Sequence, residues 1–183
     1  MKMKMKLISI GIWLAFGMVA VGCNVSPPPP KDFPYTLMLS QQDLPPGWVR
    51  LGGSFPEVEG AVAHLVAYSP EPDVSWKAIS HRIAIYPDEA AAIRAYPTWE
   101  EWFTPAMQAV EPGTFRPLSS SDEYRFEYLD VNINGQPVRS FTYLQRHKNM
   151  IMLVLVNVDN DYITLEEFIQ VLEKLDAKLQ TSE

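Results

Sequence analysis

The stretch M-I-M-L-V-L-V, Met150 to Val156, decides the fold of this chain. An unbroken apolar run of this length has no polar face, which is typical of a strand that is covered on both sides. We therefore predict a central strand of a sheet here. Immediately before it, the polar residues Arg146 to Asn149 predict a hairpin turn, and Val138 to Arg146 predict the strand that precedes the turn.

The same pattern continues outward in both directions. Asn134-Gly135 is a strong tight-turn signal, and it would join a strand over Glu123 to Leu129 to the one that begins at Val138. On the other side, Thr164 and Glu167 have the spacing of a capping box at the start of a helix. The apolar residues of that final helix form one stripe: Leu165, Phe168, Ile169, Leu172, Leu175 and Leu179.

A second helix is predicted near the middle of the chain. Asp88 is its expected N-cap, with Glu89 in the first turn. Pro97 is expected to kink or restart the helix, with Thr98 and Glu101 as a capping box at the restart. One face of this helix carries apolar residues: Ala92, Tyr96, Trp99 and Phe103.

Two further strands, Ala61 to Tyr68 and Val74 to Tyr86, are predicted before this helix. Upstream of them, a helical turn from Ser40 to Asp43 is ended by Pro45-Pro46. The folded part is expected to begin at Leu37. Because the order is strands, helix, strands, helix and the connections are short, we predict an α+β fold. It is a mainly antiparallel sheet with two principal helices packed on it.

The segment Asp43-Leu44-Pro45-Pro46-Gly47-Trp48 resembles the opening of small secreted or lipid-anchored bacterial domains. Those domains also carry a Y-x-(D/E)-x-x-A-A helix start, which is Tyr86 to Ala92 here. The layout is similar to PsbP-like α/β sandwiches and to the extracytoplasmic sensor domains of some actinobacterial kinases. The resemblance covers about residues 37 to 180 and implies a fold, without catalytic residues.

The only cysteine, Cys23, indicates the cellular location of the protein. A lysine-rich start and an apolar run from Leu7 to Val21 precede it, a length typical of a signal peptide and short for a membrane span. Ala20-Val21-Gly22-Cys23 resembles a bacterial lipobox, with Ala20 in place of the usual leucine. This resemblance implies a signal peptide over residues 1–22 and a Cys23 that carries a thioether-linked diacylglycerol, whose two chains give stable anchoring to a membrane.

Residues 23–36 are predicted to be the lipidated cysteine and a tether, and residues 37–183 a single domain. Four consecutive prolines, Pro27 to Pro30, favour an extended spacer. Loss of the signal peptide removes three lysines and takes the formal net charge from −7 to −10. An acidic domain is a poor partner for nucleic acid, so no nucleic acid is expected.

Neither catalysis nor a metal site is predicted from local motifs. The chain has no nucleophile elbow or phosphate loop, and its histidines lack metal-ligand spacing. An EF-hand register at Asp159 to Phe168 would put Val156 and Val158 at ligand positions. We therefore expect no metal, no cofactor and no enzyme activity. The alternative is a lipid-anchored hydrolase that uses His64 or His81 with a carboxylate.

A binding or accessory role remains as the favoured interpretation. A lipid anchor and a spacer position a domain near a membrane-associated partner, which raises its effective concentration there. Exposed tryptophans commonly anchor such contacts. Trp48, beside the Pro-Pro-Gly turn, and Trp102, on the first helix, are the candidate contact residues, and packing in the core is the alternative for each.

Overall fold

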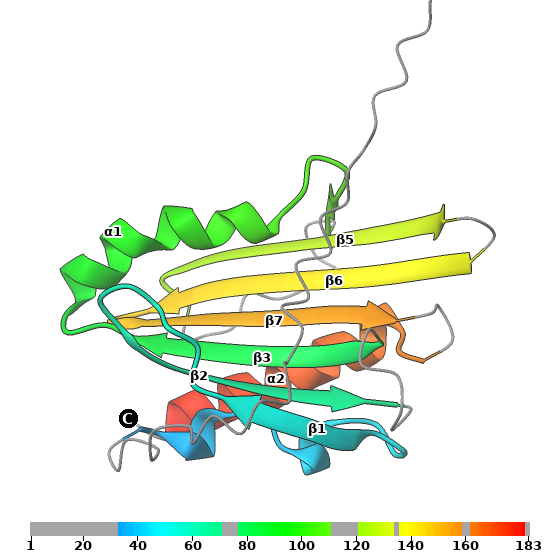
Figure 1. Ribbon diagram of the computed structural model, residues 1–183, viewed down its shortest axis with the longest axis horizontal. Coiled ribbons are helices and arrows are strands. Elements are labelled where there is room, and N and C mark those ends of the chain that lie inside the picture. Colours follow the sequence, from blue (N-terminus) through cyan, green and yellow to red (C-terminus); the bar gives the residue numbers. More distant parts are fainter. Residues whose placement is uncertain (1–32, 71–76, 111–120, 134–135, 159–161, 182–183) are drawn as a thin grey trace, which may run out of the picture.

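Seven strands form one antiparallel sheet in the order β1-β2-β3-β7-β6-β5-β4 (Figure 1). The computed structural model describes residues 33–70, 77–110, 121–133, 136–158 and 162–181. The strands are β1 (Val49–Ser54), β2 (Val62–Ser69), β3 (Ala78–Ile85), β4 (Gln108–Ala109), β5 (Glu123–Ile133), β6 (Gln136–His147) and β7 (Met150–Val158). The helices are α1 (Glu89–Trp99) and α2 (Leu165–Thr181), with 3-10 turns η1 (Tyr35–Leu37), η2 (Gln41–Asp43) and η3 (Glu100–Trp102). The predicted α+β class, with two principal helices on a mainly antiparallel sheet, is confirmed.

The apolar strand β7 lies at the centre of the sheet, as its sequence predicts. It pairs with β3 on one side, where His81 lies opposite Val154, and with β6 on the other, where Tyr143 lies opposite Val154. Its side chains are shared between two cores because alternate residues of a strand face opposite sides. Val154 faces the α2 core and Leu153 faces the α1 core.

The larger core lies between the sheet and α2, which passes behind the strands in Figure 1. Phe168 of α2 stacks on Phe141 of β6 with ring centroids 5.1 Å apart. The predicted capping box at the start of α2 is present, since the Thr164 backbone N–H donates to the Glu167 carboxylate at 2.8 Å and the Glu167 N–H donates to Thr164 Oγ1 at 3.2 Å. These caps hold the apolar stripe of α2 against the sheet.

The smaller core lies under α1 on the opposite face. Asp88 caps α1 as predicted, because its carboxylate accepts a hydrogen bond from the Ala91 N–H at 2.7 Å. All four residues of the predicted apolar face, Ala92, Tyr96, Trp99 and Phe103, are buried there. The two helices therefore cover β7 from both sides.

The predicted restart of the first helix at Pro97 is wrong. The helix continues through Pro97 to Trp99, and Thr98 Oγ1 donates to the Ala95 carbonyl at 2.7 Å instead of capping a new helix. Pro97 lies in the last turn, where the missing N–H costs only one backbone bond. The chain then tightens into η3, which carries Trp102.

The packed part of the chain extends upstream of Leu37, where the sequence predicts the folded part to begin. Phe33 is already buried in the α2-side core, so packing begins within the predicted tether. The two strands that were not predicted are weakly patterned. Strand β1 contains Gly52 and Gly53 and a β-bulge, and β4 has two residues. A Cβ at Gly53 would lie 3.0 Å from the Leu65 carbonyl oxygen, so close strand approach requires glycine there.

The hairpin turn predicted at Arg146 to Asn149 is confirmed. His147 pairs with Met150, and Lys148 adopts a φ of 50°, which a two-residue turn of this kind requires. The Asn134-Gly135 turn lies outside the described residues. The register of β5 and β6, with Ile133 opposite Gln136, leaves two residues for it.

Backbone hydrogen exchange is expected to be slowest in Met150–Val158 and faster in the edge strand Val49–Ser54. Opening β7 breaks two ladders and both cores, whereas five of the six residues of β1 are exposed. Exchange measured by NMR or mass spectrometry checks this. Faster exchange in β7 than in β1 would contradict the central placement.

Candidate functional site

The end of α1 presents two tryptophans in different environments. Trp99 is 5% exposed, and its Nε1 donates to Tyr86 Oη at 3.0 Å. Trp102 follows in η3 and is 39% exposed. Of the two alternatives for Trp102, exposure and core packing, the structure shows exposure, because the 3-10 turn rotates the indole away from the core that Trp99 enters.

Arg82 lies beneath these two indoles. It comes from β3, between Leu65 of β2 and Leu153 of β7, on the face that α1 covers. The guanidinium carbon lies 5.9 Å from the Trp99 ring centroid and 5.2 Å from that of Trp102. Both distances are within the range of cation–π attraction. We refer to Arg82, Trp99 and Trp102 as the Arg82–Trp102 surface.

The Arg82 guanidinium has no acidic partner among the residues that the structure describes. Its Nε is buried without a hydrogen-bond acceptor, and the side chain is half-buried. Burial lowers the pKa of Arg82 from its ordinary value. A desolvated guanidinium is costly unless it is paired, and cation–π contacts offset only part of that cost.

A second arginine nearby has the opposite arrangement. Arg125 lies over the Phe103 ring at 4.2 Å, but its guanidinium also pairs with Glu127 at 2.8 Å and with Glu100 at 3.7 Å. The fold thus neutralises Arg125 internally. The Arg82 guanidinium, by contrast, lies against two indoles and has no ion pair with a carboxylate in the described parts of the chain.

The structure does not support Trp48 as a contact residue, because its side chain is buried. Trp48 is 2% exposed and belongs to the α2-side core, and its carbonyl accepts a hydrogen bond from Gln41 Nε2 at 2.9 Å. The turn before it, with Gly47 at a φ of 96°, points the indole inward. A residue buried this deeply cannot contact a partner without unfolding its surroundings.

The rest of the D-L-P-P-G-W segment is structural as well. The Asp43 carboxylate accepts hydrogen bonds from the Ser40 N–H at 2.6 Å and from Lys178 Nζ at 2.5 Å, which ties the N-terminal segment to α2. Burial alone would raise the pKa of Asp43, but the hydrogen bonds from Lys178 and Ser40 outweigh it and the pKa is lowered. The stabilisation is therefore present above the ordinary carboxyl pKa and is lost as pH falls below it.

Replacing Asp43 by alanine is expected to lower the free energy of unfolding by about 3 kcal/mol, because Lys178 and Ser40 lose a partly buried partner. Asp130→Ala is the matched control, since the Asp130 side chain, which pairs with Arg139, is 38% exposed against 10% for Asp43, and it is expected to cost under about 1 kcal/mol. Urea unfolding measures both. Equal losses would contradict the structural role of Asp43.

His64 and His81 lie on the same face of the sheet and make different contacts. His81 is fully buried, and its Nδ1 accepts a hydrogen bond from the Leu39 N–H at 2.9 Å. His64 is 6% exposed and its ring lies 4.5 Å from that of Phe55. Neither imidazole has a hydrogen bond to a carboxylate within the described ranges, so these contacts supply no histidine–carboxylate dyad for the hydrolase alternative.

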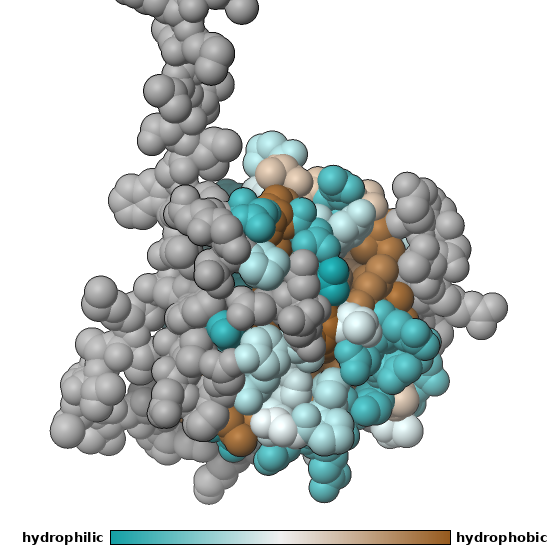
Figure 2. Space-filling view, turned by 90° about the vertical axis from the view of Figure 1, so that its right-hand side faces the viewer, coloured by the Kyte–Doolittle hydropathy of each residue, from teal (hydrophilic) through white to brown (hydrophobic). Residues whose placement is uncertain are grey.

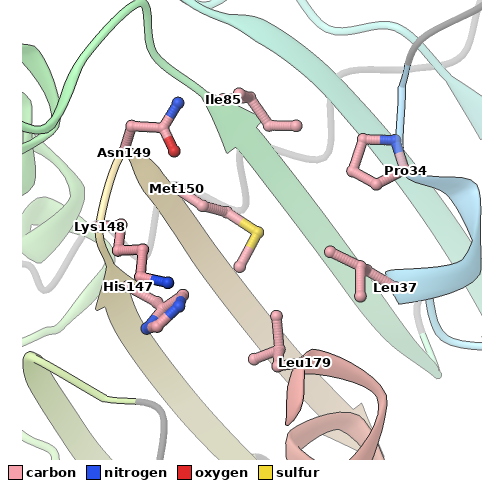
Figure 3. A pocket seen from close by; sticks show the side chains of 8 residues that line it. All are labelled: Pro34, Leu37, Ile85, His147, Lys148, Asn149, Met150 and Leu179. Atoms are coloured by element: carbon pink, nitrogen blue, oxygen red, sulfur yellow. The ribbon is translucent and has the colours of Figure 1, made fainter. Parts of the chain in front are cut away.

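A small hollow of about 170 Å³ opens at the β6–β7 turn (Figure 3). Its apolar side chains include Leu37, Met150 and Leu179, and His147 and Lys148 stand along one side. This volume is below the size usual for small-molecule sites. A second hollow of about 250 Å³ lies beside Asp43. Neither hollow includes the Arg82–Trp102 surface.

The described parts of the chain show neither a metal-binding cluster nor a membrane-spanning helix. They contain no cluster of three or more His, Cys, Asp or Glu side chains that could hold a metal ion. Within the same ranges, no helix has both the length and the apolar character needed to cross a bilayer. Seen from the end of the sheet in Figure 2, the visible described surface is mostly hydrophilic with a narrow hydrophobic band.

Comparisons with known proteins find no family model and no curated protein that matches this chain. Two solved structures overlap it distantly. One is a protein from Bacteroides thetaiotaomicron, with a TM-score of 0.38 and 16% identity over 71% of this chain and 41% of that one. The other is the extracellular domain of PknH from Mycobacterium tuberculosis, with a TM-score of 0.39 and 12% identity over 67% of this chain and 66% of that one. Overlaps this weak carry no argument about this chain.

Arg82 is the site residue that the sequence reading missed. A signal was available, because it falls on the same face of its predicted strand as Ala84 and Tyr86, which are apolar. A charged residue on a face that a helix covers requires a partner or an exit to solvent. The sequence could not show that Trp99 and Trp102 lie above it.

Proposed function

We propose that this chain is a lipid-anchored, extracytoplasmic binding or accessory domain without catalytic activity, and that it engages a membrane-associated protein. The observation that carries the proposal is Trp102, which is 39% exposed and stacked near an unpaired guanidinium. Tryptophan and arginine are the residue types most enriched where binding energy concentrates in protein interfaces.

The N-terminal pattern supports the location. Cys23 follows a lysine-rich start and an apolar run, and the Pro27 to Pro30 spacer separates it from the folded part. Acyl chains on Cys23 would hold the domain within reach of the membrane surface, where a partner encounters it at a raised effective concentration.

Changing Cys23 to alanine is expected to abolish lipidation and to leave an unprocessed precursor, because this cysteine is the only thiol in the chain. Mass spectrometry of the mature protein checks this. Trp102→Ala is the control and should remain lipidated. An intact, unmodified Cys23 in the mature wild-type protein would refute the anchor.

Photo-crosslinking in the native membranes tests the binding role. A photoreactive residue at Glu101, next to Trp102, is expected to capture a defined protein. The same residue at Leu51, an exposed position on the edge strand β1, should not capture it. Capture at Glu101 should also fall in the Cys23→Ala background. No capture at Glu101, or the same proteins at both positions, would contradict the proposal.

A further inference from the structure

The Arg82 guanidinium is the one feature of the proposed surface that the fold leaves electrically uncompensated within the described residues. Three other arginines have carboxylate partners: Arg125 with Glu127, Arg139 with Asp130, and Arg146 with Glu123. Arg82 has two indoles and no carboxylate. Its lowered pKa is due to burial alone, which agrees with the lack of a nearby acid.

The side chain is nevertheless positioned to accept a ligand. The Nε atom of Arg82 is buried, whereas its two terminal nitrogens are not fully buried. These two nitrogens make no hydrogen bond within the described ranges, so they remain in contact with solvent. Strand β3 fixes the base of the side chain between Leu65 and Leu153. The stacked indoles restrict its other end, which lowers the entropy lost on binding.

The charge balance selects the class of ligand. One unpaired guanidinium supplies one positive charge, which a carboxylate matches in charge and in planar, bidentate geometry. A dianionic phosphate would need a second free cation. Arg125, which lies over the Phe103 ring, is already paired with Glu127 and Glu100, and Glu101 adds negative charge beside Trp102. The chain as a whole is also acidic, at −7.

The shape of the site selects the source of that carboxylate. The Arg82–Trp102 surface is open on the Trp102 side, where the indole is 39% exposed, whereas sites for small molecules bury most of the ligand surface. An exposed indole beside a restrained guanidinium suits a protein surface that inserts one acidic residue and covers the ring.

We propose, building on the function proposed above, that the partner protein places a carboxylate on Arg82 between Trp99 and Trp102. The carboxylate belongs to an aspartate or glutamate side chain or to a chain terminus. It forms the ion pair that the isolated domain lacks, and the partner's neighbouring apolar surface covers Trp102.

The chemistry is tested on the lipidated protein in detergent with N-acetylphenylalanine as the probe. Binding should perturb the Arg82 Nε–H and Trp102 indole NMR signals saturably. N-acetylphenylalaninamide, which lacks the charge, should bind at least tenfold more weakly. Arg82→Gln should lose probe binding, Arg82→Lys should weaken it, and Arg125→Gln should retain it within about twofold. Equal binding of acid and amide, or tighter binding of inorganic phosphate than of the probe, would overturn the inference.

Contact with the partner protein is tested by photo-crosslinking from position 101, as described above, in variants of Arg82, Arg125 and Trp102. Capture that is lost in Arg82→Gln and kept in Arg125→Gln supports the inference. Capture that is unchanged in Arg82→Gln but lost in Trp102→Ala would overturn the inferred ion pair between a partner carboxylate and Arg82, while the proposed binding role would still be supported. Absence of capture by the wild-type protein overturns the binding role, and the inference with it. Thermal unfolding confirms that each variant is folded, and Arg82→Gln should not lower the melting temperature because it removes an unpaired charge.

Discussion

Replacing Trp48 by alanine is expected to lower the free energy of unfolding by about 4 kcal/mol, whereas the same change at Trp102 should cost less than about 1 kcal/mol. Both are tryptophans near turns, but Trp48 is 2% exposed and Trp102 is 39% exposed. Removing a buried indole loses its transfer free energy and leaves a cavity beside η2 and α2. Removing the exposed one loses part of a cation–π contact with Arg82.

Urea or guanidinium unfolding of the two variants measures this difference directly. Partner capture should show the reverse order, since a folded Trp102→Ala protein lacks the proposed contact residue. A Trp102→Ala protein that is as unstable as Trp48→Ala would show that Trp102 is a core residue. In that case any loss of binding would have a structural cause.

The second large effect concerns pH. Burial, with a smaller contribution from the Lys178 charge, lowers the pKa of His81 to about 3. The unfolded chain binds a proton at His81 near pH 6.5, while the folded protein does not until far lower pH. As the pH falls, the unfolded state therefore binds a proton at His81 before the folded state does. The free energy of unfolding consequently decreases as the pH falls from about 6.5 to about 3. Between pH 7.5 and pH 5 the loss from His81 is expected to be about 2 kcal/mol.

His81→Asn isolates this contribution, because its side-chain oxygen can still accept the Leu39 N–H while it cannot be protonated. The variant should be less stable than the wild type at pH 7.5 and should show a shallower loss toward pH 5. Lowering of the His64 pKa by burial acts in the same direction and stays in both proteins. Parallel pH profiles for wild type and variant would contradict a neutral, buried His81.

Much of the sheet could be predicted from local patterns. Three elements could be recognised locally: β7 from its unbroken apolar run, the turn at Lys148 from its polar residues, and α2 from its apolar stripe. A stripe with a period of 3.6 residues indicates which face of a helix is buried. Strand β1 could not be predicted in the same way. Gly52 and Gly53 have no side chains to show a pattern, and this strand is defined by its pairing with β2.

The two tryptophans of the candidate site show the same limit. Each follows or forms part of a turn, so the sequence assigns similar exposure to both. The Gly47 backbone conformation and the Asp43–Lys178 pair turn Trp48 into the core, while η3 turns Trp102 outward. The direction of Trp48 depends on where α2 and the N-terminal segment meet, and these two segments are more than a hundred residues apart in the chain.

By itself, the sequence determined the helix caps at Asp88 and Thr164 and the central place of β7, since these depend on neighbours within a few residues or on one uninterrupted apolar run. The tertiary structure alone decided that Trp48 is structural and that Arg82 lies unpaired beneath Trp99 and Trp102. Burial and charge pairing depend on segments that are distant in sequence. A local pattern indicates the face on which a side chain lies, but it does not indicate which side chain packs against it.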